Sequence, residues 1–156
     1  MTTEHESGSR GEREIIEMVP CPNCSSSLMG LPKSFPLFDV QCTRCLFRAQ
    51  IKTARCPPKS EIFGAGFDIL DKSLKAGQLM PPLIAHFHWT DTATGAERRE
   101  VYLFPFLTKR NIRMRTRSDK GARPGYREFN YINLFDCNVP KMIIYSVPKA
   151  ANKLCK

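Results

Sequence analysis

The feature that most constrains the fold of this chain is a pair of Cys-x-x-Cys motifs in its first third. Cys21 and Cys24 form the first motif, Cys42 and Cys45 form the second, and 17 residues lie between the two. This spacing is typical of a zinc ribbon, in which two tight turns supply four thiolates to one tetrahedral Zn²⁺. Because four thiolates fill a tetrahedral shell, we expect Zn²⁺ at this position to have a structural role.

The residues on either side of the second motif predict a β-hairpin. Residues 35–41 and 46–52 are both rich in residues that favour strands. The motif between them is short enough to form the turn. The second cysteine motif is therefore expected to connect two antiparallel strands.

Three polar side chains on this hairpin form a candidate catalytic site. Side chains alternate faces along a strand, so Gln50 and Lys52 share one face while Ile51 points the other way, into a core. Asp39 lies three residues before the second motif and Gln50 five residues after it, so the two side chains can meet across the strands. An acid, a second oxygen ligand and a lysine are typical of metal-dependent phosphodiesterases. We therefore expect Asp39 and Gln50 to bind Mg²⁺ and Lys52 to orient the attacking water.

The length and charge of the chain indicate one basic domain. The chain has 156 residues, of which 42% are hydrophobic, and this is enough for one domain with its own core. Its formal net charge is +9, but residues 1–17 contribute −3 because they carry five glutamates and two arginines. The remaining residues carry +12, and this charge favours a polyanionic partner.

Targeting signals and cysteine usage point to a reducing compartment. No apolar run is long enough to span a membrane, and the first residues resemble neither a signal peptide nor a transit peptide. Four of the seven cysteines belong to the two motifs, and Cys56, Cys137 and Cys155 follow no pairing pattern. We therefore expect a soluble cytoplasmic protein, associated with the nucleoid if the source is prokaryotic. The sequence carries no signature of its oligomeric state.

Hydrophobic patterning predicts the remaining elements. Residues 1–11 are polar and contain glycine and serine, so we expect a disordered tail, and a short helix over residues 12–18 should end before Pro20. Apolar residues spaced three and four apart predict a helix over residues 62–77, with Gly77 as its stop. Strands are expected at 83–89, 101–107 and 142–147, and a C-terminal tail at 149–156.

Two histidines in the strand expected at 83–89 are a second possible pair of metal ligands. His86 and His88 are two residues apart, so their side chains share one face of the strand. Because the thiolates of the two cysteine motifs already complete a zinc shell, we expect these histidines to have a structural role.

Residues 109–127 form the most basic segment of the chain. They include eight arginines and lysines and a single acid, Asp119. Such a density of positive charge is disfavoured unless the segment is solvated or faces phosphate, and a solvated loop is the alternative interpretation. Arginine outnumbers lysine here, and arginine is the better bidentate donor to phosphate and to the guanine edge. We therefore expect double-stranded DNA to contact Arg113, Arg115, Arg117, Lys120, Arg123 and Arg127.

Taken in order along the chain, these motifs resemble a known family. The blocks CPNC, FDVQCTRC and QIK are followed by TKRNIRMRT, GARPGYREFNYINLFDCNVPK and MIIYSV. This order is similar to the catalytic domain of the DpnI-like restriction endonucleases, which are PD-(D/E)xK nucleases with a zinc ribbon in the catalytic hairpin and cut adenine-methylated GATC DNA. The resemblance covers residues 12–148, with the ribbon at 21–45. It implies an α/β fold with a central mixed sheet, helices on its faces and the zinc ribbon at one edge.

The resemblance also implies roles for individual residues. Asp39 matches the metal-binding acid and Lys52 the catalytic lysine of a Mg²⁺-dependent endonuclease. Gln50 stands where the family has glutamate, and related branches with Q-x-K remain active. In such nucleases an acid on the helix ahead of the hairpin sometimes adds to the metal shell, and Glu14 or Glu17 can do so here. The alternative for these two glutamates is a solvated helix face.

Other classes of function remain open on the sequence alone. Family members carry a C-terminal winged-helix domain, whereas this sequence ends at Lys156, so the resemblance implies a catalytic module with its own DNA contacts. One alternative is a catalytically degenerate zinc-ribbon module that binds DNA without cutting it, and Gln50 is the best argument for it. Another is a structural zinc domain whose basic surface docks on an acidic protein.

Overall fold

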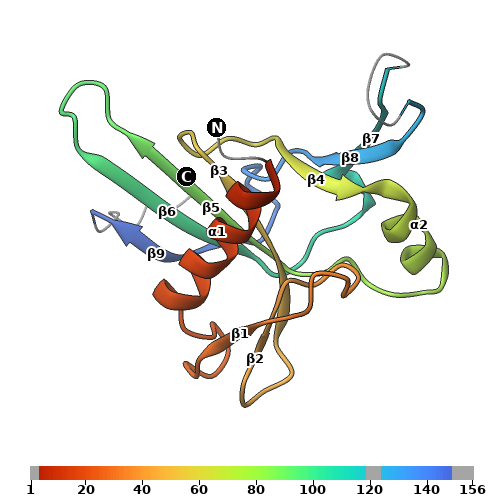
Figure 1. Ribbon diagram of the computed structural model, residues 1–156, viewed down its shortest axis with the longest axis horizontal. Coiled ribbons are helices and arrows are strands. Elements are labelled where there is room, and N and C mark those ends of the chain that lie inside the picture. Colours follow the sequence, from red (N-terminus) through yellow and green to blue (C-terminus); the bar gives the residue numbers. More distant parts are fainter. Residues whose placement is uncertain (1–3, 119–123, 149–156) are drawn as a thin grey trace.

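The computed structural model describes residues 4–118 and 124–148, apart from the side chains of residues 4–7. These residues form a mixed α/β structure that is mainly sheet, with two α-helices (Figure 1). One sheet has six strands in the order β1-β2-β3-β5-β6-β9, and the other has three in the order β4-β8-β7. The elements are α1 (Glu4–Met18), β1 (Leu28–Gly30), β2 (Val40–Cys42), β3 (Arg48–Ala54), β4 (Ile62–Gly66), α2 (Phe67–Lys75), β5 (Leu83–Thr90), β6 (Glu97–Phe104), a 3₁₀ turn (Lys109–Asn111), β7 (Ile112–Thr116), β8 (Arg127–Tyr131) and β9 (Met142–Val147).

The six-stranded sheet is mixed, as the family resemblance implies. Strands β3 and β5 run parallel, and the other neighbouring pairs in this sheet are antiparallel. After β3 the chain forms β4 and α2 before it returns as β5, because parallel neighbours need a crossover connection. Strands β1 and β2 form one edge of this sheet (Figure 1). The hairpin of β2 and β3 has the second cysteine motif at its turn, as predicted, but the strand expected over residues 35–41 begins only at Val40, so that prediction is wrong for residues 35–39.

Helix α1 packs on one face of the six-stranded sheet because its buried residues recur at every fourth position. Gly11 and Ile15 are buried, and so is Val19, one residue beyond the end of the helix. A Cβ atom added at Gly11 would lie 2.3 Å from the Thr53 Oγ1 atom, so the absence of a side chain lets α1 approach β3 closely. Ile15 and Val19 then join the core that α1 shares with the sheet.

The start of α1 corrects the prediction of a disordered tail over residues 1–11. The helix begins at Glu4, so the prediction is wrong for residues 4–11, and residues 1–3 lie outside the described part of the chain. Polar composition alone suggested disorder, but Gly11, the last residue of the expected tail, packs closely on Thr53 and belongs to a helix that begins at Glu4. The helix predicted over residues 12–18 is its second half.

The opposite face of the six-stranded sheet is covered by the three-stranded sheet and α2, and not by helices alone as expected. This second core combines Leu83, Ala85, Phe87 and Phe104 with Ile62, Leu70, Phe129 and Tyr131. The helix predicted over residues 62–77 begins only at Phe67, because residues 62–66 form β4. A Cβ atom at Gly64 would lie 2.3 Å from the Phe129 ring, so the absence of a side chain at Gly64 lets β4 lie close to Phe129 of β8. The predicted stop is confirmed, since Gly77 has a φ angle of +84°.

The strands predicted at 83–89 and 142–147 are confirmed as β5 and β9. The strand predicted at 101–107 is β6, which begins earlier, at Glu97, and ends before Pro105. The tail expected at 149–156 lies outside the described residues. None of the helices in the described residues has the length and apolar character needed to cross a membrane.

Candidate functional site

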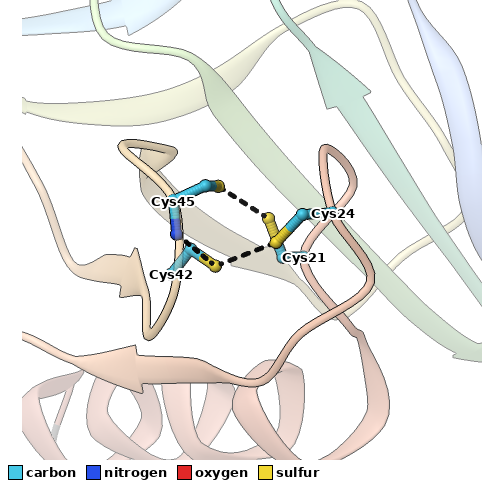
Figure 2. A group of neighbouring side chains, drawn as sticks. All are labelled: Cys21, Cys24, Cys42 and Cys45. Atoms are coloured by element: carbon cyan, nitrogen blue, oxygen red, sulfur yellow. Dashed lines mark hydrogen bonds between the residues drawn. The ribbon is translucent and has the colours of Figure 1, made fainter.

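The four cysteines of the two motifs meet at the edge of the six-stranded sheet (Figure 2). Cys21 and Cys24 lie between α1 and β1, whereas Cys42 ends β2 and Cys45 lies in the turn to β3. The four Sγ atoms lie within 4.8 Å of one another, with 3.6 Å between Cys21 and Cys45 and 3.4 Å between Cys24 and Cys42. Sulfurs at Zn–S distances of about 2.3 Å in a tetrahedron would lie about 3.8 Å apart, so the cluster is compatible with a structural zinc site.

Hydrogen-bond donors surround these sulfur atoms. The backbone N–H groups of Arg44 and Cys45 donate to Cys42 Sγ, at 3.3 and 3.4 Å. Hydrogen bonds from Ser26 lower the pKa of the Cys24 thiol to about 6. Such donors stabilise the thiolate, which is the form of cysteine that binds a metal.

Two hydrogen bonds to the backbone of β3 hold Asp39 against that strand. The Asp39 N–H donates to the Ala49 carbonyl oxygen at 3.0 Å, and the Ile51 N–H donates to Asp39 Oδ2 at 2.7 Å. The pairing of β2 with β3 stops at Val40 and Ala49. The Ile51 N–H of β3 therefore has no carbonyl partner on β2, and the Asp39 carboxylate accepts its hydrogen bond instead. Asp39 is therefore placed beside residues 50–52, where the hairpin pattern predicts it.

Glu12, Asp39 and Lys52 form an electrostatically coupled group. Burial raises the pKa of Glu12, and the charge of Asp39 raises it further. Burial also raises the pKa of Asp39, although the Ile51 N–H and the Lys52 charge lower it. Burial lowers the pKa of Lys52, although Asp39 and Glu12 raise it. Two carboxylates that repel each other provide hard oxygen ligands, and a divalent cation such as Mg²⁺ would relieve their repulsion.

Gln50 lies in the same region and is almost completely buried. Its exposed fraction is 5%, and the Tyr131 hydroxyl on β8 donates a hydrogen bond to its Oε1 atom. Ile51, the next residue, packs into the core on the opposite face, beneath α1. Strand β3 is therefore covered on both faces, and the side chain of Gln50 reaches across to the three-stranded sheet.

The structure adds two residues that the sequence pattern does not identify. The helix acid coupled to Asp39 is Glu12, whereas Glu14 contacts the guanidinium groups of Arg10, Arg55 and Arg99, and Glu17 is exposed. Glu12 and Glu14 differ because two residues rotate a helix by about 200°. The register of Gly11 on Thr53 sets which glutamate faces Asp39. Tyr131 has no sequence signal, because it lies 81 residues from Gln50.

Four of the five described arginines of the basic segment are paired with acids. The pairs are Arg113 with Glu61, Arg115 and Arg117 with Glu128, and Arg127 with Asp68. Glu128 is only 2% exposed, whereas the four arginine side chains are 40–60% exposed. Lys120 and Arg123, which the sequence also predicts to bind DNA, lie outside the described residues.

No protein-family model matches the sequence, and no curated protein matches it. A function can therefore be argued only from the geometry and the chemistry of these sites.

Proposed function

We propose that this protein is a metal-dependent DNA endonuclease of the restriction type, with a PD-(D/E)xK-like site. The observation that carries the proposal is the convergence of Glu12, Asp39 and Lys52, which come from α1, the approach to β2, and β3. Two acids provide ligands for a cation, and a partly buried lysine beside them can position water and offset phosphate charge. The DNA chemistry that we expect is hydrolysis of a phosphodiester, directed to adenine-methylated GATC.

Each residue has a distinct task in the proposed reaction. Asp39 and the Gln50 amide oxygen, with Glu12 as a further ligand, would hold Mg²⁺, and a cation there would supply stabilisation of negative charge on the phosphate. The Ile51 N–H keeps Asp39 Oδ2 in place, which leaves Oδ1 for the cation. Lys52 positions the water whose oxygen forms a bond to phosphorus while the bond from phosphorus to the leaving sugar oxygen breaks.

The arginines of β7 and β8, together with Arg117 just after β7, are the proposed DNA contacts. A guanidinium group has five N–H donors, and a single carboxylate takes at most two of them, so paired arginines still offer donors to phosphate. The Arg115 guanidinium also lies 5.8 Å from the centre of the Phe63 ring, and that of Arg117 lies 5.7 Å from the Tyr126 ring. These acid and ring contacts restrict the side chains before DNA arrives, which reduces the entropy lost on binding.

We assign Zn²⁺ a structural role at the cysteine cluster. The cluster joins the segment between α1 and β1 to the turn that leads into β3. It would therefore hold together the two elements that carry Glu12 and Gln50. Four thiolates leave no coordination position for a substrate, so this metal takes no part in the chemistry.

A catalytically degenerate DNA-binding module is the second candidate, and the environment of Gln50 favours it. A neutral amide binds Mg²⁺ less strongly than a carboxylate does. The Oε1 atom of Gln50 also accepts a hydrogen bond from Tyr131. This candidate predicts salt-dependent DNA binding without cleavage.

The proposal is tested with zinc-loaded protein, Mg²⁺ or Mn²⁺, and two plasmid preparations, one adenine-methylated and one unmethylated. We expect cleavage of the methylated plasmid. Asp39→Ala and Lys52→Ala should abolish cleavage, and Lys52→Ala should still bind DNA in a gel-shift assay. Lys72→Ala is the matched control, because Lys72 is an exposed lysine on α2, and it should cut normally.

The other outcomes separate the candidate functions. Cleavage of both plasmids would keep the nuclease and remove the methyl specificity. Unchanged cutting by Lys52→Ala would end the assignment of this site. A protein that binds DNA and cuts neither plasmid with either metal would be the degenerate module.

A further inference from the structure

The contact between Tyr131 and Gln50 joins the two sheets at the candidate site. Tyr131 is completely buried in the three-stranded sheet, and its hydroxyl donates to the Oε1 atom of Gln50 in the six-stranded sheet. The Tyr131 ring is itself fixed by Phe129, whose ring centre lies 5.1 Å away in an edge-to-face arrangement. The hydroxyl therefore approaches Gln50 from a rigid part of the core.

The chemistry of the amide allows this contact to serve metal binding. A carbonyl oxygen has two lone pairs, so Oε1 can accept the Tyr131 hydrogen bond and still bind a cation. Glutamine has three rotatable side-chain bonds, and a neutral amide binds a cation only weakly. Such a ligand gains from a partner that fixes the position of its oxygen. A tyrosine hydroxyl is an O–H donor at neutral pH, so Tyr131 can supply this hydrogen bond to Oε1.

We propose that Tyr131 is a positioning residue that holds the Gln50 carbonyl oxygen as a ligand for a divalent cation beside Asp39. This inference rests on the proposed function, because it assumes that the site binds such a cation. Tyr131 acts through Gln50 and touches neither the substrate nor the reacting atoms. A glutamate at position 50 would add a third carboxylate, buried and charged, to the site that contains Asp39 and Glu12, and the neutral amide of Gln50 avoids this cost.

The test is a Mn²⁺ titration of the zinc-loaded protein without DNA, followed by electron paramagnetic resonance. Tyr131→Phe should weaken Mn²⁺ binding by roughly 10- to 100-fold, the usual effect of removing a residue that orients a metal ligand. Gln50→Met keeps the size of the side chain and removes the oxygen, so it should weaken binding by at least as much. Tyr102→Phe is the matched control, because it removes a tyrosine hydroxyl that donates to Glu100 instead, and it should bind Mn²⁺ normally.

The double variant Tyr131→Phe/Gln50→Met separates positioning from general stability. Since Tyr131 acts through Gln50, adding Tyr131→Phe to Gln50→Met should cause no further loss of Mn²⁺ affinity. The double variant also removes both partners of a buried hydrogen bond, so it should fold even if a single variant does not.

Each contrary result has its own meaning. Normal Mn²⁺ binding by Tyr131→Phe would overturn the inference and leave the proposed nuclease intact. A further loss in the double variant, relative to Gln50→Met, would also overturn it, because Tyr131 would then act independently of Gln50. Absence of Mn²⁺ binding by the unaltered protein would instead count against the proposed function itself, and the inference would fall with it.

Discussion

His86 is a buried titratable residue that the proposed reaction does not use. It is completely buried, neither ring nitrogen has a hydrogen-bond partner among the described residues, and its Nδ1 atom lies 3.9 Å from Glu14 Oε2. Burial lowers the pKa of His86 to about 4; Glu14 opposes this shift, while the positive charges of Arg99, His88 and Arg55 add to it. The side chain is therefore neutral in the folded protein at neutral pH, which suits the structural role predicted from the sequence.

We expect the free energy of unfolding to fall as the pH drops from 6.5 towards 4. The unfolded chain binds a proton at His86 near the ordinary pKa, whereas the folded protein does so only near pH 4, so acid favours unfolding by up to about 3 kcal/mol. His86→Phe should flatten this part of the pH dependence, as measured by urea unfolding across this range. His88→Gln, a change in a partly exposed histidine, should retain most of it. An unchanged slope in His86→Phe would contradict the prediction.

At the scale of secondary structure elements, the contact between α1 and β3 decides which helix acid reaches the candidate site. Gly11 and Thr53 meet at this contact, and Glu12 follows Gly11 directly. The Thr53 hydroxyl oxygen is buried and has no hydrogen-bond partner among the described residues. The contact is therefore tight, and a larger residue at position 11 would displace the helix.

The two glycines of α1 give a matched pair of substitutions for this contact. A methyl group at Gly11 would lie 2.3 Å from Thr53 Oγ1 and 2.9 Å from Thr53 Cβ, whereas one at Gly8 would meet nothing within 4 Å. Gly11→Ala should destabilise the protein by about 1–3 kcal/mol through overpacking. Gly8→Ala should stabilise it by about 0.5–1 kcal/mol, because alanine favours a helix. Urea unfolding measures both, and a smaller loss for Gly11→Ala in a Thr53→Ala background would locate the clash.

The β1–β2 edge depends on the cysteine cluster, because each of these strands has only three residues. Cys24→Ser should lose the bound zinc and lower the melting temperature by roughly 5–10 °C, equivalent to about 2–3 kcal/mol. Cys137→Ser changes an exposed cysteine outside the cluster and should keep one zinc per chain. Metal analysis and thermal melts measure both effects, and full zinc content in Cys24→Ser would rule out a four-thiolate site.

At the scale of the whole molecule, acids partly neutralise the positive charge of the basic segment, residues 109–127. The arginines of β7 and β8, together with Arg117, contact Glu61 and Asp68, which are distant in sequence, and Glu128, which directly follows the basic segment. Strands β7 and β8 lie at one end of the molecule, and the turn between β5 and β6 lies at the opposite end (Figure 1). A net charge of +9 therefore does not by itself locate the DNA-binding surface.

Salt dependence of DNA binding can locate this surface. Arg113→Gln should weaken binding to any sequence and reduce the slope of log Kd against log salt concentration by about 1, the loss of one phosphate contact. Arg98→Gln removes an arginine of the β5–β6 hairpin, which pairs with Asp91, and should leave the slope unchanged. Fluorescence anisotropy with a labelled duplex measures both slopes. Equal slopes for the unaltered protein and Arg113→Gln would exclude β7 from the DNA contact.

The sequence by itself determined the features that depend on residues close together in the chain. The spacing of Cys21, Cys24, Cys42 and Cys45 predicts one cluster, and the four sulfur atoms do meet. The strand pattern on either side of Cys42 predicts the hairpin, which places Asp39 beside Ile51. Turn geometry and strand alternation act over a few residues, so they can be read from short segments.

Only the tertiary structure decided the features that depend on contacts between distant segments. The prediction that Ile62–Gly66 is helical failed because those residues pair with β8 and pack closely on Phe129. The acid near Asp39 is Glu12, and not Glu14 or Glu17, because of where α1 rests on β3. Tyr131 reaches Gln50 because the two sheets face each other across a common core. Hydrophobic burial fixes these relations in three dimensions, and no local pattern in the chain records them.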